Sequence, residues 1–299
     1  MALIKIAAII LNFHQHKYLI QLLSGLEKAG AEFYMFYFIG DILPFPEEKE
    51  IVRRLISENE IGKKIKYITF DKNIGYANGN NFLIKTAFLM DNFDYILISN
   101  PDIRIIDDNV LNELVKKMEI DNKIGIIGPK VLNFNRQQGP YIKPNPWVYG
   151  LKYLFPFFWL PFWLLRESYI RFFMSSQSVW RVIGAFMLIK PRPFFAVGGF
   201  DEGTFLYFEE DLLSYRFKKE GFITYYFSKV RVLHLAERND RPEITLRSME
   251  YCLGKMGYSK IPIKFATSAY SFYGSFWKNK IIRSFMYLKR ISQKLSSII

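Results

Sequence analysis

Cysteine is nearly absent from this 299-residue chain, which contains only Cys252. A single cysteine excludes an intrachain disulfide and is typical of a protein from a reducing compartment. The sequence also lacks an internal repeat and a low-complexity segment. Half of the residues are hydrophobic and 18% are aromatic, so the chain can bury a substantial core. Its length predicts one large domain or one domain with an appendage.

Long uninterrupted hydrophobic runs are also missing. Thirteen uncharged residues separate Lys152 from Arg166, and Pro156 and Pro161 interrupt them. A membrane-spanning helix needs about 20 apolar residues, so this stretch is too short and too broken to span a bilayer. The aromatic-rich segment 147–173 fits an apolar acceptor groove or a membrane interface. An ordinary hydrophobic subdomain with buried aromatic residues fits it equally well.

No small-residue cleavage site follows the apolar start of the chain. The run up to Leu11 passes directly into Asn12-Phe13-His14. A secretory signal peptide would end in small residues, so we expect a first β-strand here instead.

Acidic residues are absent after Glu250, although the chain carries a net charge of +13. Nine lysines and arginines follow, on a body that is nearly balanced in charge. Residues 276–295 have the spacing of a basic amphipathic helix. We expect this helix to contact an anionic membrane surface, and the alternative is that it packs on the protein's own body. A nucleic-acid partner is not expected, because clustered acids at 201–211 interrupt any basic open face.

Strand-like and helix-like segments alternate through the first half of the chain. This alternation predicts an α/β fold with a mostly parallel, doubly wound sheet. Buried-strand patterns occur at 3–12, 32–39, 66–70, 95–99 and 124–128. Helical patterns occur at 15–30, 47–59, 80–91 and 107–120.

The apolar run Tyr95–Ser99 ends abruptly in Asn100-Pro101-Asp102. Proline cannot donate a hydrogen bond to a sheet, so the strand must end there and leave Asp102 at its carboxyl end. In open α/β sheets ligands bind at that edge. A carboxylate there can hold a divalent cation that in turn holds a diphosphate. The alternative is an ordinary turn aspartate that caps the following segment.

Three further stretches carry polar groups suited to a site. Residues 71–81 combine small residues with asparagines, as a phosphate-binding loop or a helix cap would. Residues 205–216 place three consecutive acids after an aromatic run, which suits either a helix start or a general base with a raised pKa. His234 follows a strand-like segment at 229–233 and is a candidate metal ligand, although a lone histidine is usually structural.

Taken in order, these motifs resemble those of the family 2 glycosyltransferases of GT-A fold, especially the bacterial rhamnosyltransferase-like members. The resemblance extends from about Ile4 to Arg238. Its matching stretches are Asn12-Phe13-His14, the loop 73–81, Asn100-Pro101-Asp102, Gly198–Glu202 and Tyr207–Arg216.

The resemblance implies a GT-A catalytic domain over 1–245 and a basic helical extension over 246–299. Within the domain, residues 1–130 would form the nucleotide-sugar half. Residues 131–245, with the aromatic segment 147–173, would form the acceptor half.

The resemblance also implies a role for individual residues. Asp102, with Mn²⁺ or Mg²⁺ and completed by His234, would bind the donor diphosphate. Glu210 would remove the acceptor proton in a single inverting displacement, with Glu209 and Asp211 beside it. The expected nucleotide-sugar contacts are Asn12, Phe13, Asp41, Asn73, Gly75, Tyr76, Asn81, Asn100 and Asp102. The expected acceptor contacts are Trp180, Gly184, Phe200, Asp201 and Arg216.

The chain departs from the family at two places. The second strand ends in Phe38-Ile39-Gly40-Asp41 in place of the usual Asp-Asn-x-Ser, so nucleoside recognition is expected to differ. The usual catalytic Asp is Glu210, and Asp211 stands where a neutral residue is common. Both acids stay candidates for the base. Glu210 is favoured because aligning the chain with the family at Arg216 places Glu210 at the position of the catalytic acid.

The expected partners are a nucleotide-diphosphate sugar, first dTDP-L-rhamnose and then a UDP-hexose, and a polyprenyl-linked or oligosaccharide acceptor in surface-polysaccharide synthesis. A homodimer is among the expected assemblies. We expect a cytoplasmic protein held peripherally at the inner face of the plasma membrane. The rival interpretations are a catalytically silent GT-A scaffold and a basic nucleic-acid-binding protein.

Overall fold

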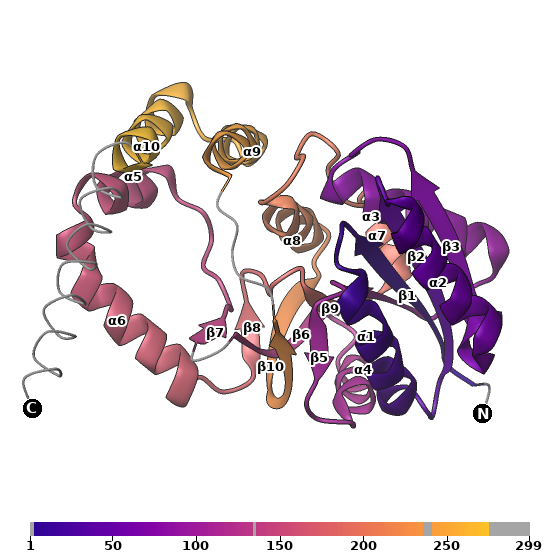
Figure 1. Ribbon diagram of the computed structural model, residues 1–299. Helices are drawn as coiled ribbons and strands as arrows, with labels where there is room; N and C mark the ends of the chain where they lie inside the picture. The colour runs from indigo at the N-terminus through magenta and orange to yellow at the C-terminus, as the bar shows by residue number, and fades with distance from the viewer. Residues whose placement is uncertain (1–2, 134–135, 236–240, 275–299) are drawn as a thin grey trace, which may run out of the picture. The chain divides into compact units, whose positions relative to one another are not determined.

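The computed structural model describes residues 3–133, 136–235 and 241–274. The chain forms two compact units, each taken separately below (Figure 1). Unit 1 comprises 1–143 and 167–239, and unit 2 comprises 144–166 and 240–299. Contacts thus group part of the aromatic-rich segment with the C-terminal residues. The predicted boundary between catalytic domain and extension at residue 245 stays a prediction.

Unit 1 is built on one ten-stranded sheet, counted over the described residues. Its path runs β3-β2-β1-β4-β9-β6-β10-β5, with β7 beside β6 and β8 beside β10. The bounds are β1 Lys5–Asn12, β2 Tyr34–Ile42, β3 Ile65–Phe70, β4 Tyr95–Ser99, β5 Ile103–Ile105, β6 Ile124–Asn133, β7 Arg136–Gln138, β8 Gln177–Val179, β9 Phe186–Ile189 and β10 Ile223–His234.

Strands β1 to β4 are parallel to one another, as the βα alternation predicts. Strand β9 is antiparallel to both β4 and β6, so the second half of the sheet is mixed. Strand β10 returns to the parallel direction beside β6. The carboxyl ends of β1, β2 and β4 therefore meet at one edge of the sheet.

Helices cover both faces of this sheet. The helices of unit 1 are α1 His16–Ala29, α2 Pro46–Glu58, α3 Tyr76–Met90, α4 Val110–Ile120, α7 Pro191–Ala196 and α8 Glu209–Lys219, with a short 3₁₀ turn at Glu60–Lys64. Apolar residues of α1, α2 and α4 join one core cluster. Those of α3, α7 and α8 join the other. Strand β1 contributes Ile6, Ala8 and Ile10 to the first cluster and Ala7 and Ile9 to the second, so it is buried on both faces.

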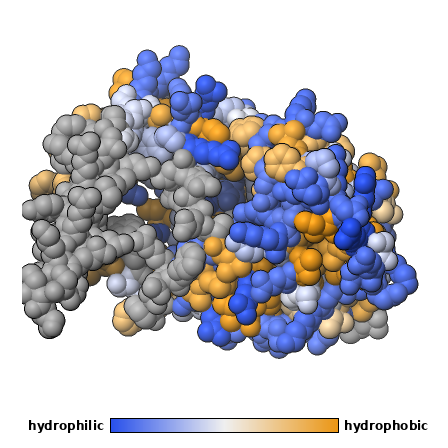
Figure 2. Space-filling model, in the orientation of Figure 1, coloured by the Kyte–Doolittle hydropathy of each residue, from blue (hydrophilic) through white to orange (hydrophobic). Residues whose placement is uncertain are grey.

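Hydrophilic residues interspersed with small hydrophobic areas cover the face of unit 1 seen in Figure 2. This mixture is ordinary for a protein surface in water. The ligand edge of the sheet therefore has to be located from individual polar groups rather than from a broad surface patch.

Unit 2 is helical in its described part. Its helices are α5 Pro146–Leu154, the first part of α6 Pro156–Phe172, α9 Pro242–Lys255 and α10 Lys260–Phe272. Helix α5 packs on α10 through ring contacts, Trp147 with Phe265 and Tyr153 with Tyr270, at 5.4 and 4.9 Å between centroids. Gly150 makes this approach feasible, because a Cβ atom there would lie 2.1 Å from the Phe265 ring.

Among the described residues, no single helix has the length and apolar character needed to cross a membrane. Helix α5 and residues 156–170 of α6 reach that length only when counted together, and a bend of 110° separates them. The predicted basic helix at 276–295 lies outside the described residues.

Candidate active site

The predicted metal carboxylate lies at the ligand edge of the sheet. Asp102 follows β4 and is almost fully buried. Its Oδ1 lies 3.2 Å from Nε2 of His234, at the end of β10, and forms no aligned hydrogen bond. Its Oδ2 accepts a hydrogen bond of 3.3 Å from Gln15 Nε2. The other ring nitrogen of His234 is 2.6 Å from Gln138 Oε1, which fixes the imidazole orientation.

This pair has the chemistry of a divalent-metal site. Asp102 leaves one buried carboxylate oxygen without a hydrogen-bond partner, next to an imidazole nitrogen. The 3.2 Å separation is near the roughly 3 Å expected between adjacent ligands of an octahedral ion with bonds of about 2.1 Å. Within the described residues, no cluster of three His, Cys, Asp or Glu side chains suits a metal. The pair thus fits Mg²⁺ or Mn²⁺ if substrate and water supply the remaining ligands.

Three predicted motifs meet on the backbone of two adjacent residues, Gly184 and Ala185, just before β9. The Tyr76 hydroxyl donates to the Gly184 carbonyl at 2.8 Å. The Gly184 N–H donates to Glu210 Oε1 at 2.9 Å. The Asn100 N–H donates to the Ala185 carbonyl, also at 2.9 Å. The donor loop (residues 73–81), the Asn-Pro-Asp turn (residues 100–102) and the acid cluster (residues 209–211) are therefore brought together.

Gly184 packs closely against Glu210 at this junction. A Cβ atom built on it would lie 2.4 Å from Glu210 Oε1. Any larger residue would push the carboxylate away or break its hydrogen bond to the Gly184 N–H. This glycine therefore sets the position of Glu210.

The three adjacent acids at the start of α8 lie in different environments. Glu209 and Asp211 are almost completely buried, whereas Glu210 is partly exposed. Burial, reinforced by the neighbouring Glu210 charge, raises the pKa of Glu209 to about 8. Burial also raises the pKa of Asp211 to about 6, against the opposing charge of Arg181. Glu210 is thus the acid of the three that a substrate can reach.

Asp211 is held by its neighbours. Its Oδ1 accepts a 2.8 Å hydrogen bond from Trp180 Nε1. Its Oδ2 lies 2.8 Å from Arg181 Nε, and the Arg181 guanidinium stacks 3.8 Å above the Tyr141 ring. Asp211, next to Glu210 in the sequence, therefore orients Trp180, which we predicted as an acceptor contact. These bonds favour Glu210 over Asp211 as the base.

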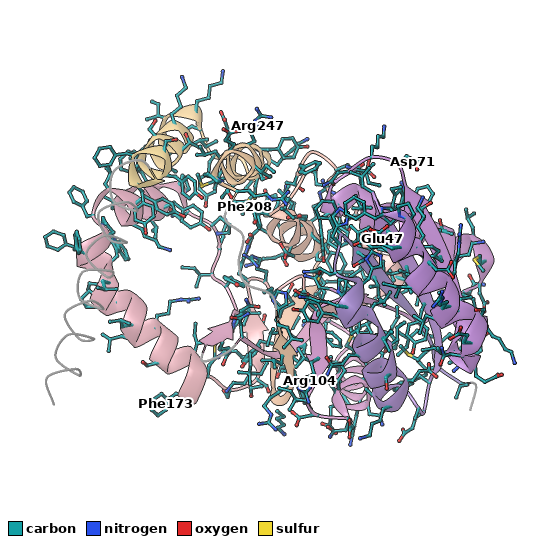
Figure 3. All side chains as sticks on the ribbon, in the orientation of Figure 1. Glu47, Asp71, Arg104, Phe173, Phe208 and Arg247 are labelled. Atoms are coloured by element: carbon teal, nitrogen blue, oxygen red, sulfur yellow. The ribbon has the colours of Figure 1, made fainter. Side chains whose placement is uncertain are left out.

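A strained turn leads into α8. Tyr207 and Phe208 have φ values of 73° and 70°, in a region that costs a non-glycine residue roughly 1–3 kcal/mol. Figure 3 shows Phe208 at the start of α8. The Glu209 carboxylate accepts a 2.9 Å hydrogen bond from the Tyr207 N–H and so braces the turn. Such strain persists where the surroundings fix the conformation, commonly at active sites.

The donor loop is anchored against the same turn. The Tyr76 N–H donates to the Phe205 carbonyl at 2.8 Å. Gly75 has a φ of 80°, and a Cβ atom there would lie 2.5 Å from that carbonyl oxygen. The Asn73 side chain accepts from the Gly75 N–H at 3.0 Å. Asn73, Gly75 and Tyr76 thus shape the loop, and the approach of its backbone to a ligand stays a prediction.

At the ends of β1 and β2, polar groups are bonded mainly to each other. Asp41 is fully buried and accepts from Asn12 Nδ2 at 2.9 Å and from the Tyr67 hydroxyl at 2.7 Å. His16 Nε2 lies 2.6 Å from Asp41 Oδ2, and its Nδ1 lies 3.1 Å from Glu48 Oε1. We did not predict His16, Glu48 or Tyr67, because nothing in the local sequence links helix α2 and strand β3 to Asp41.

The surface beside this network is aromatic. Phe13 is exposed, and the His14 ring stacks at 4.8 Å on Phe45, which is also exposed. His14 has a left-handed φ of 55° and lies 2.9 Å from Glu48 Oε2. Of the three predicted residues in this region, only Phe13 therefore presents a side chain to solvent, whereas Asn12 and Asp41 are enclosed.

Four predicted contact residues stabilise the loop before α8. Both ends of the Asn81 amide bond the Phe200 backbone, at 2.9 and 3.0 Å. Phe200 itself is in the core. Arg216 bonds the Asp201 carboxylate and the carbonyls of Val197 and Gly199. These placements favour support of the loop over direct contact with a substrate.

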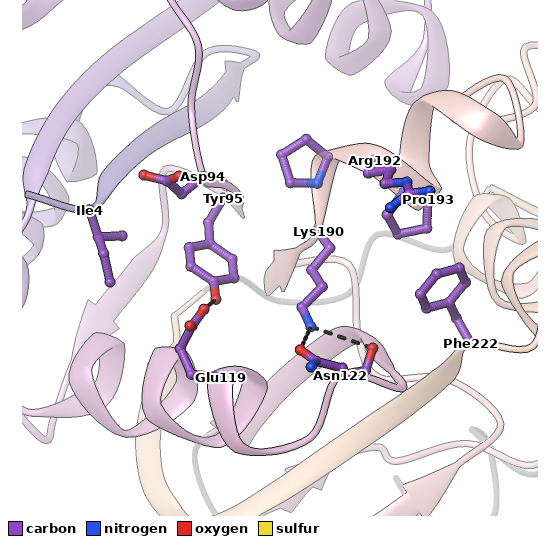
Figure 4. Close-up of a pocket in the computed structure, with 10 residues that line it drawn as sticks. Ile4, Asp94, Tyr95, Glu119, Asn122, Lys190, Arg192, Pro193 and Phe222 are labelled. Atoms are coloured by element: carbon purple, nitrogen blue, oxygen red, sulfur yellow. Dashed lines mark hydrogen bonds between the residues drawn. The ribbon is translucent and has the colours of Figure 1, made fainter. Parts of the chain in front are cut away.

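A separate cavity of about 470 Å³ lies at the opposite edge of the sheet, at the start of β1 and β4 (Figure 4). Lys190 reaches across it to the Met118 carbonyl at 3.1 Å and to Asn122. Tyr95 and Glu119 are hydrogen-bonded on another wall. Its lining includes none of the predicted site residues. The chemistry of the chain therefore points to the carboxyl edge instead.

Comparison with solved structures identifies the fold. The mannosyltransferase PcManGT from Pyrobaculum calidifontis, solved with GDP-Man and Mn²⁺, matches 90% of this chain and 69% of its own, with a TM-score of 0.55 at 12% identity. GalNAc-T7, solved with UDP, GalNAc and Mn²⁺, matches 94% and 57%, with a TM-score of 0.59 at 14% identity. The fold is therefore that of the GT-A glycosyltransferases, as predicted.

No family model matches the chain, but curated relatives do. A low-salt glycan biosynthesis hexosyltransferase, Agl10 of Haloferax volcanii, is 29% identical over 157 residues, 52% of this chain. The N-acetylglucosaminyl-diphospho-decaprenol L-rhamnosyltransferase of Mycobacterium tuberculosis is 26% identical over 145 residues, 47% of this chain. The chain spans about half the length of each relative. These matches confirm the resemblance to the rhamnosyltransferase-like family 2 glycosyltransferases.

Proposed function

We propose that this protein is an inverting glycosyltransferase that moves a sugar from a nucleoside diphosphate to an acceptor hydroxyl. The observation that carries the proposal is the meeting of three motifs on Gly184 and Ala185. Tyr76 of the donor loop, Asn100 of the metal turn and Glu210 of α8 all bond that short backbone stretch. A displacement needs the donor and the base in one place, and the meeting of these motifs at one junction supports the proposal.

Asp102 and His234 would hold the metal, Mn²⁺ or Mg²⁺. Asp102 offers a buried oxygen without a hydrogen-bond partner, and Gln138 orients the His234 ring. The ion supplies neutralisation of the charge that grows on the leaving diphosphate. The loop at 73–76 would support the diphosphate end of the donor. Its glycine lets the backbone approach the diphosphate closely, and its asparagine shapes the turn.

Glu210 would act as the general base. Glu210 is partly exposed, and its carboxylate accepts a hydrogen bond from the Gly184 N–H. It takes the proton from the acceptor hydroxyl as that oxygen attacks the anomeric carbon, and the bond to the diphosphate oxygen breaks. One displacement inverts the anomeric configuration. Buried Glu209 and Asp211 then support the base, because they brace the turn and orient Trp180.

For the substrates we propose L-rhamnose from dTDP-L-rhamnose, with a UDP-hexose as the next donor, and a lipid-linked glycan as acceptor. The support is the likeness to a rhamnosyltransferase whose name specifies a diphospho-decaprenol acceptor. The likeness to a glycan-biosynthesis hexosyltransferase points the same way. The nucleoside would lie beside Phe13 and the His14–Phe45 pair, since Asp41 is fully enclosed.

A catalytically silent scaffold is the second candidate, and the closed network around Asp41 favours it. We predicted Asp41 as the nearest substitute for the family's nucleoside-gripping residues, whereas here three side chains of the protein bond it. The accessible Glu210 and the metal-ready Asp102 weigh against the scaffold.

Thermal shift with a panel of nucleotide sugars, in Mn²⁺ or in chelator, tests the proposal. We expect one donor to raise the melting temperature only with metal, and the Asp102→Ala variant to lose that shift. The Asp108→Ala variant is the matched control, because Asp108 lies on the surface and pairs with Lys28. No shift with any donor in a folded sample would overturn donor binding and favour the scaffold.

A further inference from the structure

Helix α6 exposes an unusual amount of apolar side chain. Phe158, Leu160, Phe162, Leu164 and Leu165 are between 47% and 76% exposed. Figure 3 shows Phe173 just beyond the carboxyl end of the same helix, and it is also exposed. Soluble surfaces rarely gather large hydrophobic residues in this way, and such a gathering marks an interaction surface.

The exposed arc is broad. At about 100° per residue, the five side chains from Phe158 to Leu165 span roughly 200° of the helix. Trp159 and Arg166, on the remaining side, are only half-buried. A groove on another protein usually takes a narrower stripe, whereas a helix lying in an apolar solvent contacts it over a wide arc.

The net positive charge of unit 2 is much higher than that of the rest of the chain. Residues 144–166 and 240–299 contain thirteen lysines and arginines but only three acids, which accounts for +10 of the chain's net +13. Part of that charge lies on described helices, at Lys152, Arg247, Lys255, Lys260 and Lys264. An apolar helix within a strongly cationic unit complements a bilayer whose headgroups are anionic.

The length of helix α6 and the interruptions in its sequence limit how deeply it can insert into a bilayer. Helix α6 is 17 residues long, and a bend of 110° separates it from α5. Arg166 interrupts its apolar sequence, and Trp147, exposed on α5, is a residue type that favours the headgroup level. These features suit a helix that lies in one leaflet rather than one that crosses both.

We propose that α6 is a membrane-docking surface, whose apolar arc inserts into the interface of an anionic bilayer while the cationic unit 2 holds the headgroups. For the function proposed above, on which this point rests, docking places the enzyme where a polyprenyl-linked acceptor is anchored. In the cell the surface would be the inner face of the plasma membrane.

The test compares two charge-matched double variants of the full chain in vesicle co-sedimentation. Phe158→Glu with Leu165→Glu places two acids in the arc. Leu89→Glu with Met90→Glu places two acids at exposed apolar positions of α3, in unit 1. Vesicles contain phosphatidylcholine alone or with phosphatidylglycerol.

We expect the wild type to bind the anionic vesicles. The α6 variant should bind at least about tenfold more weakly, because two large apolar side chains no longer enter the interface. The α3 variant should stay within about twofold of wild type, since it changes the net charge equally and leaves the arc intact. The circular dichroism of both variants should match the wild type.

Equal binding by all three proteins, or an equal loss in both variants, would overturn the proposal. It would also fail if the wild type ignored vesicles and were a dimer that the α6 variant converts to a monomer, since a second copy would then cover the arc. Donor binding without vesicles keeps this result separate from the proposed function. The α6 variant should retain the nucleotide-sugar thermal shift even where its docking is lost.

Discussion

Two ends of one sheet edge carry similar polar residues in opposite states. At the ends of β1 and β2, Asn12, His16 and Asp41 bond each other and are closed to solvent. Just after β4, Asp102 keeps an oxygen without a hydrogen-bond partner, and at the start of α8 Glu210 is partly exposed. The residue type at a strand end therefore does not decide its use. What decides it is whether other groups of the protein already satisfy the hydrogen bonds of that residue.

The sharpest way to test this contrast is to neutralise the accessible acid. Glu210→Gln should lower kcat by about 10³-fold, because an amide cannot take the acceptor proton, while donor binding is kept. The measurement is steady-state transfer with the donor that the thermal-shift panel identifies. Glu220→Gln, just past the end of α8, is the control and should retain full activity. Near-normal activity in Glu210→Gln together with an inactive Asp211→Asn would make Asp211 the base.

Removing the metal carboxylate comes next. Asp102→Asn should lower kcat/KM by about 10²-fold or more, because the charge that holds the ion is lost. Activity should also fall in chelator for the wild type and return with Mn²⁺. Asp108→Asn should behave as the wild type. Full metal-dependent activity in Asp102→Asn would place the ion elsewhere.

The junction can be broken without removing a charge. Gly184→Ala should lower kcat by about 10²-fold, because the new methyl group would lie 2.4 Å from Glu210 Oε1 and displace it. Donor affinity and the melting temperature should change little. Gly254→Ala, where nothing lies within 4 Å, is the matched control. Normal kcat in Gly184→Ala would show that the Gly184 contact does not position the base.

The closed end of the edge should respond in stability instead of rate. Asp41→Ala should lower the free energy of unfolding by about 2 kcal/mol, because buried donors on Asn12 and Tyr67 lose their acceptor. Chemical denaturation measures this, with exposed Asp71→Ala as control. Activity per folded molecule should stay within about threefold. A large loss of donor affinity in a stable Asp41→Ala protein would instead make Asp41 a ligand residue.

The effect that is smallest per pH unit concerns the buried acids. Because the pKa of Glu209 rises from 4.5 to about 8 on folding, the folded state binds more protons than the unfolded state between those values. The free energy of unfolding should therefore fall as pH rises through this window, by at most about 1.4 kcal/mol per pH unit from this group. Asp211 acts in the same direction up to about pH 6. Denaturation across the range should show a flatter slope in Glu209→Gln, and an unchanged slope would contradict the assignment.

Much of the nucleotide half could be predicted from local sequence. The run Tyr95–Ser99 is a strand with the predicted bounds, because Pro101 stops it and both of its faces are buried. Helix α3 begins at Tyr76, four residues before the predicted start. The polar segment that follows is helical because the Asn80 and Asn81 side chains bond within the fold, which local propensity cannot reveal.

The remaining features depend on contacts between distant residues. Strand β9 is short, and its antiparallel pairing with β4 and β6 follows from a register that no local pattern encodes. Helix α6 continues through Pro161, where we predicted a break. In the site, Glu210 was predicted from the order of motifs. The closure of Asp41 required His16 and Tyr67, which come from other elements.

The position of β9 also determines when the sheet can be completed during synthesis. Strand β4 has its parallel neighbour β1 early in the chain, but its other edge pairs with β9, where Ile96 faces Ile189. Strand β6 and helices α5 and α6 emerge from the ribosome before that partner. Until then the nascent chain presents a mostly apolar strand with an open edge, a hazard for aggregation. Chains that terminate before Ile189 should therefore be recovered as aggregates, even though their nucleotide-half strands are complete.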